Sequence, residues 1–296
     1  MVTVRMIGGT IALAIVIATG AGAQAGRAAM DEGVKLLNAN QPEKAEKKFE
    51  EAIKADPKYG LYHLWLGRAV GTQAQEANIL RQPFLAKRVK AEFERAAELD
   101  PALLDARDGL IDFYLRAPGF MGGSVEKARE QQRLIAERDP MLGHLAAVKI
   151  AWHQKDTVAT EKALRAAGAA QPDSALPIIR LGQFQQQWGR TEAAFATYDG
   201  FAVKHPNDVG IRFQTARLAA ISGQQLPRGE KLLRDLLTAP DWEAGPSRPN
   251  KAAVHFRLGM VLEKSGRKDE ARAAYETAIA LNPNLQLAKD ALKALK

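Results

Sequence analysis

A short pattern recurs along this chain and constrains its fold more than any other feature. A small residue is followed four positions later by an aromatic residue, three later by another small or apolar residue, and five later by proline. Prolines accordingly fall at positions 57, 101, 140, 172, 206, 240 and 283, with spacings of 44, 39, 32, 34, 34 and 43 residues. Self-similarity at a period of about 20–45 residues is typical of repeat arrays, in which each unit packs on its neighbours. The clearest copies of the pattern are Ala45-Phe49-Ala52-Pro57, Ala194-Tyr198-Phe201-Pro206 and Ala271-Tyr275-Ala278-Pro283.

A leucine–glycine pair precedes the best of these copies and opens a helix-like apolar period. The pairs are Leu66-Gly67, Leu181-Gly182 and Leu258-Gly259. The composition is alanine-rich with only 6% aromatic residues, which favours helices over sheets. Glycine in the first helix lets the second helix approach closely, the aromatic side chain fills the space between them, and proline ends the second helix. The sequence therefore predicts a series of helix–turn–helix units.

With leucine–glycine, alanine, aromatic and proline positions over 34 residues, this pattern resembles the tetratricopeptide repeat. The resemblance covers about residues 26–285 and implies an all-α, right-handed α-solenoid of about seven repeats. Residues 26–296 are expected to form the solenoid, with repeats at 26–59, 60–101, 102–140, 141–174, 175–208, 209–240 and 252–285 and a capping helix at 285–296. The expected structural positions are Gly67, Gly182, Gly259, Ala45, Phe49, Ala194, Tyr198, Ala271, Tyr275, Ala278 and Pro283.

Residues 1–25 have the features of a secretory signal peptide. Arg5 precedes an apolar core at Ile11–Ala18, and small residues with the spacing of a cleavage site follow at Ala21–Ala25. The core is well short of the roughly 20 apolar residues that a spanning helix needs. We therefore expect a periplasmic or secreted bacterial protein, with an uncleaved inner-membrane anchor as the alternative. The whole pattern also resembles a group of exported bacterial tetratricopeptide proteins of unassigned role.

Three insertions interrupt the repeat spacing. Residues 72–84 are expected to lengthen both helices of the second repeat. Residues 116–124, RAPGFMGGS, form a glycine-rich loop for which the expectation is a long turn capped by Ser124. The alternative is a ligand-binding or envelope-assembly role for that loop, for instance as an anion site at the following helix. Residues 241–250 form a third loop, in which Trp242 packs on the solenoid or contacts a partner.

Nothing in the sequence predicts catalysis. The chain has no cysteine, which excludes disulfides, cysteine-ligated zinc and a cysteine nucleophile. The five histidines show no metal-binding spacing, and no nucleophile elbow is present. His63, His144 and His255 share one register position and are expected to pack between helices. We expect neither cofactor nor metal.

The predicted binding surface is the concave face, which the first helix of each repeat lines in this family. The register places a row of basic and aromatic residues there, above an apolar layer. Such a row suits an acidic or carboxylate-bearing peptide, because arginine makes charge-assisted hydrogen bonds to carboxylates. Pairing of these cations with acids on neighbouring helices is the alternative. The candidate residues are Arg68, Arg107, Tyr114, Lys149, Trp152, Arg180, Gln183, Arg217 and Arg257.

The resemblance therefore predicts a non-catalytic protein–protein interaction scaffold. The net charge is +8, but lysine and arginine alternate with aspartate and glutamate along the chain. Nucleic-acid-binding proteins cluster their positive charge on one stripe instead, so no nucleic-acid partner is expected. No stable membrane span is expected after cleavage of the signal.

Overall fold

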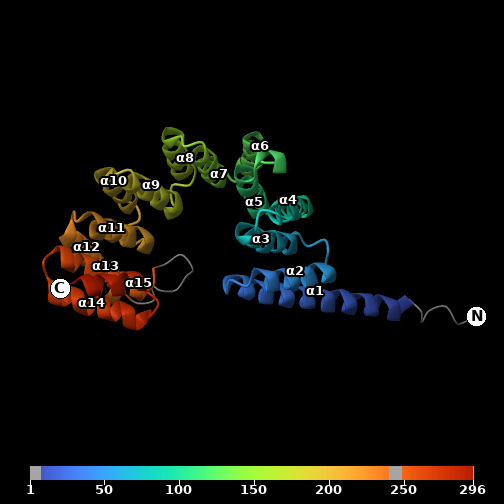
Figure 1. Cartoon of the computed structure of the whole chain (residues 1–296), viewed down its shortest axis with the longest axis horizontal. Helices are drawn as coiled ribbons and strands as arrows, with labels where there is room; N and C mark the ends of the chain where they lie inside the picture. The colour runs from blue at the N-terminus through green and yellow to red at the C-terminus, as the bar shows by residue number, and fades with distance from the viewer. Residues whose placement is uncertain (1–7, 240–248, 296) are drawn as a thin grey trace, which may run out of the picture. The chain divides into compact units, whose positions relative to one another are not determined.

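The computed structural model describes residues 8–239 and 249–295, and these residues form helices and connecting turns (Figure 1). The observed helix pairs confirm the predicted all-α class. From the N-terminus the helices are α1 (Gly8–Asn38), α2 (Pro42–Ala55), α3 (Gly60–Glu76), α4 (Gln82–Leu99), α5 (Leu104–Arg116), the 3-10 helix η1 (Gly119–Met121), α6 (Val125–Ala136) and α7 (Pro140–His153). They continue with α8 (Thr157–Ala170), α9 (Ala175–Gln187), α10 (Thr191–Ala202), α11 (Val209–Ser222), α12 (Leu226–Thr238), α13 (Lys251–Lys264), α14 (Lys268–Leu281) and α15 (Gln286–Ala294).

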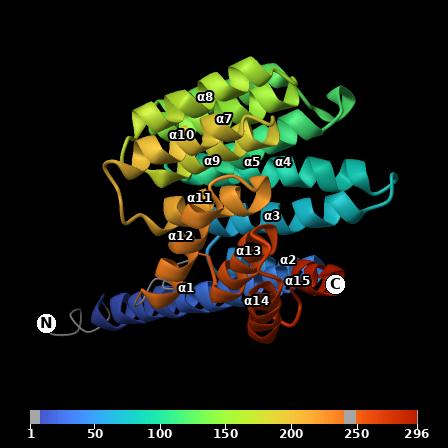
Figure 2. The ribbon, with the colours of Figure 1, turned by 90° about the vertical axis from the view of Figure 1, so that its left-hand side faces the viewer.

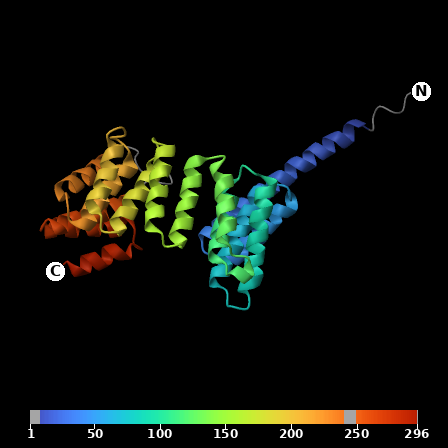
Figure 3. The ribbon, with the colours of Figure 1, turned by 90° about the horizontal axis from the view of Figure 1, so that it is seen from above.

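The chain divides within α8 into two compact units, residues 1–160 (unit 1) and 161–296 (unit 2). In each unit, helices that follow one another pack as antiparallel pairs (Figures 2 and 3). The first helices of successive pairs also contact each other: α3, α5 and α7 in unit 1, and α9, α11 and α13 in unit 2. Each unit therefore presents one row of first helices, and the predicted binding residues lie on these two rows.

The helices of a pair approach closely because a glycine faces a large ring. A methyl group added to Gly182 would lie 2.3 Å from ring atoms of Tyr198, and one on Gly259 would lie 2.4 Å from Cε1 of Tyr275. Carbon atoms in favourable contact are about 3.5–4.0 Å apart, so only glycine fits at these two positions without movement of the ring. Gly67 lies against Phe93 in the same way. The side chains of Ala45, Phe49, Ala194, Tyr198, Ala271, Tyr275 and Ala278 are buried at these contacts, whereas Pro283 is exposed in the turn after α14.

Local sequence signals fix the ends of several helices. The side chains of Asp139, Asp208 and Asn250 accept hydrogen bonds from backbone N–H groups in the first turns of α7, α11 and α13, at 2.8–2.9 Å. Gly189 and Gly266 have φ values of +70° and +78° in the turns between paired helices. This left-handed conformation is open to glycine at little cost, so these residues end one helix and begin the next turn.

The insertion at residues 72–84 lengthens both of its helices, as predicted. Helix α3 has 17 residues and α4 has 18, against 12–14 in the helices of most other pairs. The third insertion, with Trp242, lies largely outside the described residues. Its last residue, Asn250, is described and caps α13.

Helix α1 continues without a break through residue 25, where the signal peptide was expected to end. None of the helices in the described ranges is both long and apolar enough to cross a membrane. Cleavage and export remain predictions from the sequence.

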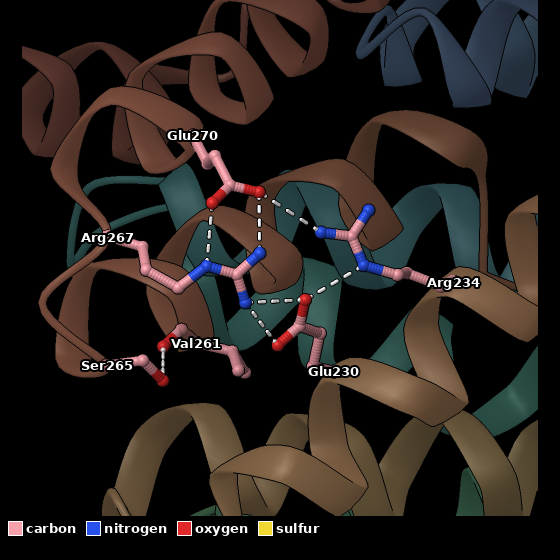
Figure 4. A network of polar contacts seen from close by, with 6 residues as sticks. All are labelled: Glu230, Arg234, Val261, Ser265, Arg267 and Glu270. Carbon is pink, nitrogen blue, oxygen red and sulfur yellow. Dashed lines mark hydrogen bonds and ion pairs between the residues drawn. The ribbon is translucent and has the colours of Figure 1, made fainter.

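An ion-pair network ties α12 to the turn between α13 and α14 (Figure 4). Arg267 donates to both carboxylate oxygens of Glu230 at 2.7 and 2.8 Å and also bonds Glu270. Arg234, one turn along α12, donates to Glu230 at 2.9 Å. Partial burial alone would raise the pKa of Glu230, but the bonds from Arg267 and Arg234 outweigh it and hold this pKa below its ordinary value.

Candidate functional site

In unit 1 the predicted basic residues of the first-helix row are already neutralised. Arg68 of α3 donates to Asp105 of α5 at 2.8 Å. Lys149 of α7 donates to two further aspartates of α5, Asp108 at 2.7 Å and Asp112 at 3.0 Å. Pairing with acids on neighbouring helices, the alternative for these cations, is therefore what the structure shows. This part of the row carries cations and anions in alternation and has no basic ladder.

Three other residues of unit 1 were predicted to line the groove, and the structure places their side chains differently from one another. Arg107 turns toward α6 and donates to Gln131 at 3.1 Å, so its guanidinium lies between the paired helices. Tyr114 is buried, and its hydroxyl donates to Glu94 of α4; it belongs to the core, which corrects its place among the groove residues. Burial also raises the pKa of Tyr114 to about 12. Trp152 is half-exposed in the last turn of α7.

Unit 2 has a different inner row, in which two arginines on adjacent helices have no acidic partner among the described residues. Arg217 of α11 and Arg257 of α13 are both partly buried and close enough for their charges to repel. Arg217 donates to the amide oxygen of Gln186 at 3.0 Å. Arg257 lies over the ring of Phe256, 4.9 Å from its centroid, and its Nη1 lies 3.0 Å from the sulfur of Met260. No carboxylate of the described residues pairs with either guanidinium.

Burial and the charge of Arg217 both lower the pKa of Arg257, in that order of size. An arginine side chain stays protonated at neutral pH even when its pKa falls, because its ordinary value is above 12. The site therefore holds two positive charges that the surrounding protein has partly desolvated and does not neutralise. Such an arrangement costs stability unless an anion occupies it.

The remaining predicted residues extend this surface along α9. Gln183 is exposed, and its amide nitrogen lies 3.4 Å from the amide oxygen of Gln214 on α11. Arg180, one turn earlier on α9, is exposed and forms no ion pair with the described residues. Together Arg180, Gln183, Gln186, Gln214, Arg217 and Arg257 form what we call the unit 2 inner surface. It offers guanidinium and amide groups on three adjacent helices.

In the glycine-rich loop at residues 116–124, backbone N–H groups donate hydrogen bonds to carbonyl groups of the same chain. The N–H groups of Met121 and Gly123 donate to the carbonyl of Pro118, and that of Ser124 donates to the carbonyl of Tyr114. Ser124 Oγ in turn accepts from the Lys127 N–H at 3.3 Å, as expected for a helix cap. A phosphate-binding loop presents such N–H groups free to the ligand, so this loop lacks the means to act as one.

The histidines lie among packing and ion-pair partners. His63 Nδ1 lies 2.7 Å from Glu92 and its Nε2 lies 3.3 Å from the Pro57 carbonyl, between α3 and α4. Partial burial lowers the pKa of His255, with the charge of Lys251 a lesser cause. Across the part of the chain that the structure describes, no group of three or more metal-binding side chains comes together.

Sequence reasoning missed the aspartate row of α5. Asp105, Asp108 and Asp112 are spaced by three and four residues, which places them on one helix face. That spacing was the available signal, since the same register that placed Arg68 and Lys149 on the first-helix row also places these acids there. The partial burial of the Arg217–Arg257 pair had no signal in the sequence.

Comparisons with known proteins agree with this architecture. Residues 30–70 and 252–285 each match the tetratricopeptide repeat family. A comparison with curated proteins finds no match.

Similar solved structures include a tetratricopeptide repeat protein from Parabacteroides merdae, at 13% identity, 92% coverage of this chain, 99% of that one and a TM-score of 0.51. Yeast Tom70 is similar at 13% identity over 87% of this chain and 51% of its own, with a TM-score of 0.56. The human IFIT1 dimer with m7Gppp-AAAA is similar at 16% identity over 92% and 62%, with a TM-score of 0.56. At these identities the likeness shows the fold alone. The repeat pattern, the helix pairs and the two family matches together show that this chain contains tetratricopeptide repeats.

Proposed function

We propose that this protein is a non-catalytic interaction scaffold of the bacterial cell envelope and that its unit 2 inner surface binds a carboxylate-bearing segment of a partner protein. The tetratricopeptide fold supports an interaction scaffold in general. The single observation that carries the finer proposal is the Arg217–Arg257 pair, which has no acid of the described chain to neutralise it. The signal-like sequence of residues 1–25 supports the compartment.

A carboxylate suits this site for three reasons. Guanidinium groups form charge-assisted bonds to carboxylates, often through two parallel N–H donors. The two arginines are partly buried, so an anion bound between them is screened less by solvent than at an open surface. The glutamine amides beside them can bond the backbone of an extended peptide, which adds contacts that do not depend on charge. An acidic peptide that lies along α9, α11 and α13 would use all of these groups.

The test uses a fluorescent peptide rich in aspartate and glutamate and its asparagine/glutamine counterpart, with binding followed by anisotropy. The variant is Arg217→Gln with Arg257→Gln, and the matched control is Arg212→Gln. Arg212 lies on the same helix but pairs with Asp235 of α12 at 3.4 Å. We expect the double variant to raise the Kd of the acidic peptide at least ~10-fold, equivalent to about 1.4 kcal/mol, and the control to leave it nearly unchanged.

The double variant also gives a stability readout. Removal of two unneutralised charges should leave the urea midpoint unchanged or raise it, because a site kept for binding is often less than optimally stable. Equal affinity of the acidic and amide peptides, or unchanged affinity in the double variant, would refute the carboxylate site. If a single-stranded oligonucleotide bound more tightly than the acidic peptide and lost affinity in the same double variant, the ligand of this site would be a nucleic acid and the peptide proposal would be wrong.

The proposed compartment has its own test. The N-terminal sequence of the protein recovered from a bacterial envelope fraction should begin at Gln24 or Gly26. A retained Met1 would contradict cleavage and favour the anchored alternative.

A further inference from the structure

Four large apolar side chains of unit 1 stand almost fully in solvent. Ile79 and Leu80 lie in the turn between α3 and α4, and Phe84 lies in the first turn of α4; they are 79%, 78% and 78% exposed. Phe120, in η1 between α5 and α6, is 85% exposed. Single exposed apolar residues are ordinary on a protein surface, whereas a group of them marks an interaction surface.

The two segments that carry these side chains lie next to each other. Helix α4 contacts η1. Gln82 and Ala86 of α4 line a cavity of about 540 Å³ together with Pro118 and Met121 of the glycine-rich loop. Figures 2 and 3 show both turns projecting from the same end of unit 1. The four apolar side chains therefore lie on two neighbouring segments at one end of the unit.

The backbone of both turns is fixed by bonds within the chain. Asn78 Oδ1 accepts hydrogen bonds from the Leu80 and Arg81 N–H groups at 3.2 and 3.1 Å. In the second turn there is room only for glycine at Gly123, since a methyl group there would lie 1.7 Å from the carbonyl oxygen of Ala117. Because these turns are built in one conformation, the outward placement of Ile79, Leu80 and Phe120 is a feature of the fold.

The segment that carries Ile79, Leu80 and Phe84 is basic. Between Glu76 and Glu92 the sequence has four basic residues and no acidic one. Two of them are paired: Arg88 with Glu46 and Glu50 of α2, and Lys90 with Glu94. The other two, Arg81 and Lys87, are exposed and have no ion-pair partner among the described residues. Arg116, at the start of the second turn, is likewise exposed and without such a partner.

We propose that this end of unit 1 docks on an anionic lipid bilayer. The tip patch consists of the apolar residues Ile79, Leu80, Phe84 and Phe120 and the cations Arg81, Lys87 and Arg116. Apolar side chains on projecting turns can enter the boundary between headgroups and acyl chains, while nearby cations bind lipid phosphates. A bilayer accepts such projections without a matching pocket, and cations beside an anionic membrane add attraction within a Debye length. This inference is independent of the peptide site in unit 2.

The absence of native cysteine allows a site-specific test in the full chain. Single variants Phe84→Cys and Phe120→Cys are labelled with an environment-sensitive nitrobenzoxadiazole dye. Val158→Cys is the matched control, since Val158 is also 78% exposed in unit 1 but lies on α8. With vesicles that contain phosphatidylglycerol, we expect a blue shift and increased emission at residues 84 and 120 and neither change at residue 158. Absence of a shift at both tip positions would overturn the proposal.

Sedimentation with the same vesicles measures the contribution of charge. The variant Arg81→Glu with Lys87→Glu and Arg116→Glu is compared with a control of equal charge change on α2, Lys44→Glu with Lys47→Glu and Lys54→Glu. Every protein retains residues 1–25, so any membrane affinity of that segment is common to all. We expect the tip variant to lose at least ~10-fold in vesicle partitioning and the control to change by less than about threefold.

A further variant, Ile79→Ser with Leu80→Ser, Phe84→Ser and Phe120→Ser, measures the apolar contribution. All four positions are exposed, so thermal unfolding followed by circular dichroism should match wild type. We expect loss of binding equal to or larger than that of the charge variant. Equal losses in the tip and control charge variants, or equal binding to neutral phosphatidylcholine vesicles, would overturn the assignment to this patch.

Discussion

The contact between Gly259 and Tyr275 permits a quantitative test of the helix pairing. Tyr275 is fully buried between α13 and α14, and its hydroxyl donates to Glu263 at 2.6 Å. Replacement of a buried aromatic side chain by alanine typically costs about 3–5 kcal/mol, because it removes apolar contacts and leaves a cavity. The hydroxyl contributes about 1 kcal/mol of this, since Glu263 is partly exposed and can bond water instead. We therefore expect losses near 4 kcal/mol for Tyr275→Ala and about 1 kcal/mol for Tyr275→Phe.

A second substitution makes the prediction specific to this contact. In wild type, the methyl group of Gly259→Ala would lie 2.4 Å from Cε1 of Tyr275, so the ring must move by about 1 Å in a close-packed core. Overpacking of this kind costs about 1–3 kcal/mol, against which alanine gains about 1 kcal/mol in helix propensity. In the Tyr275→Ala background the ring is absent, and the same methyl group fits. Gly259→Ala should therefore change from destabilising to stabilising, with a coupling energy of about 1–3 kcal/mol.

The assay must resolve local stability, because repeat arrays do not always unfold in one step. Urea unfolding by circular dichroism gives the total, and amide hydrogen exchange of α13 and α14 locates the change. Gly200→Ala in α10 is the matched control, since the added methyl group meets nothing within 4 Å apart from the adjoining residues and backbone of its own helix. It should stabilise the chain by about 0.5–1 kcal/mol. A coupling energy below about 0.5 kcal/mol between residues 259 and 275 would refute the close approach.

Two further predictions concern pH. Burial raises the pKa of Tyr198 to about 12 from its ordinary value of 10, so the stability that its neutral hydroxyl contributes is complete below pH 10 and is lost as the pH rises through 12. In Tyr198→Phe the urea midpoint should therefore fall less steeply with pH over this range. An alkaline slope equal to that of wild type would contradict the prediction. Bonds from Arg267 and Arg234 hold the pKa of Glu230 below its ordinary value despite partial burial, so its contribution is present above pH 4.5 and is lost as the pH falls through the folded-state pKa. Glu230→Gln should lower the free energy of unfolding by about 1 kcal/mol at neutral pH and should reduce its loss at acid pH, as measured by urea midpoints. A midpoint lowered by the same amount at every pH would exclude this carboxylate as the cause of the acid dependence.

The fold could be predicted from the sequence because the same pattern of packing residues recurs several times along the chain. A small residue such as Gly182 and a ring such as Tyr198 must occur at fixed spacing if two helices are to meet closely, so the spacing alone predicts the pairing. The candidate site was less predictable. The register placed Arg68, Lys149 and Arg217 alike, yet only Arg217 lacks an acid of the described chain.

The sequence by itself determined the helices, their pairing and the kind of side chain at each register position, since these depend on local periodicity. Only the tertiary structure decided which charges are neutralised, because ion pairs such as Lys149 with Asp108 join residues 41 positions apart and depend on how neighbouring helices rotate. It also decided that the insertion at residues 72–84 ends in an exposed turn beside the glycine-rich loop, because α4 and η1 meet only when the helices stack. Local pattern specifies helices, whereas desolvation and contact between distant segments exist only in the folded chain.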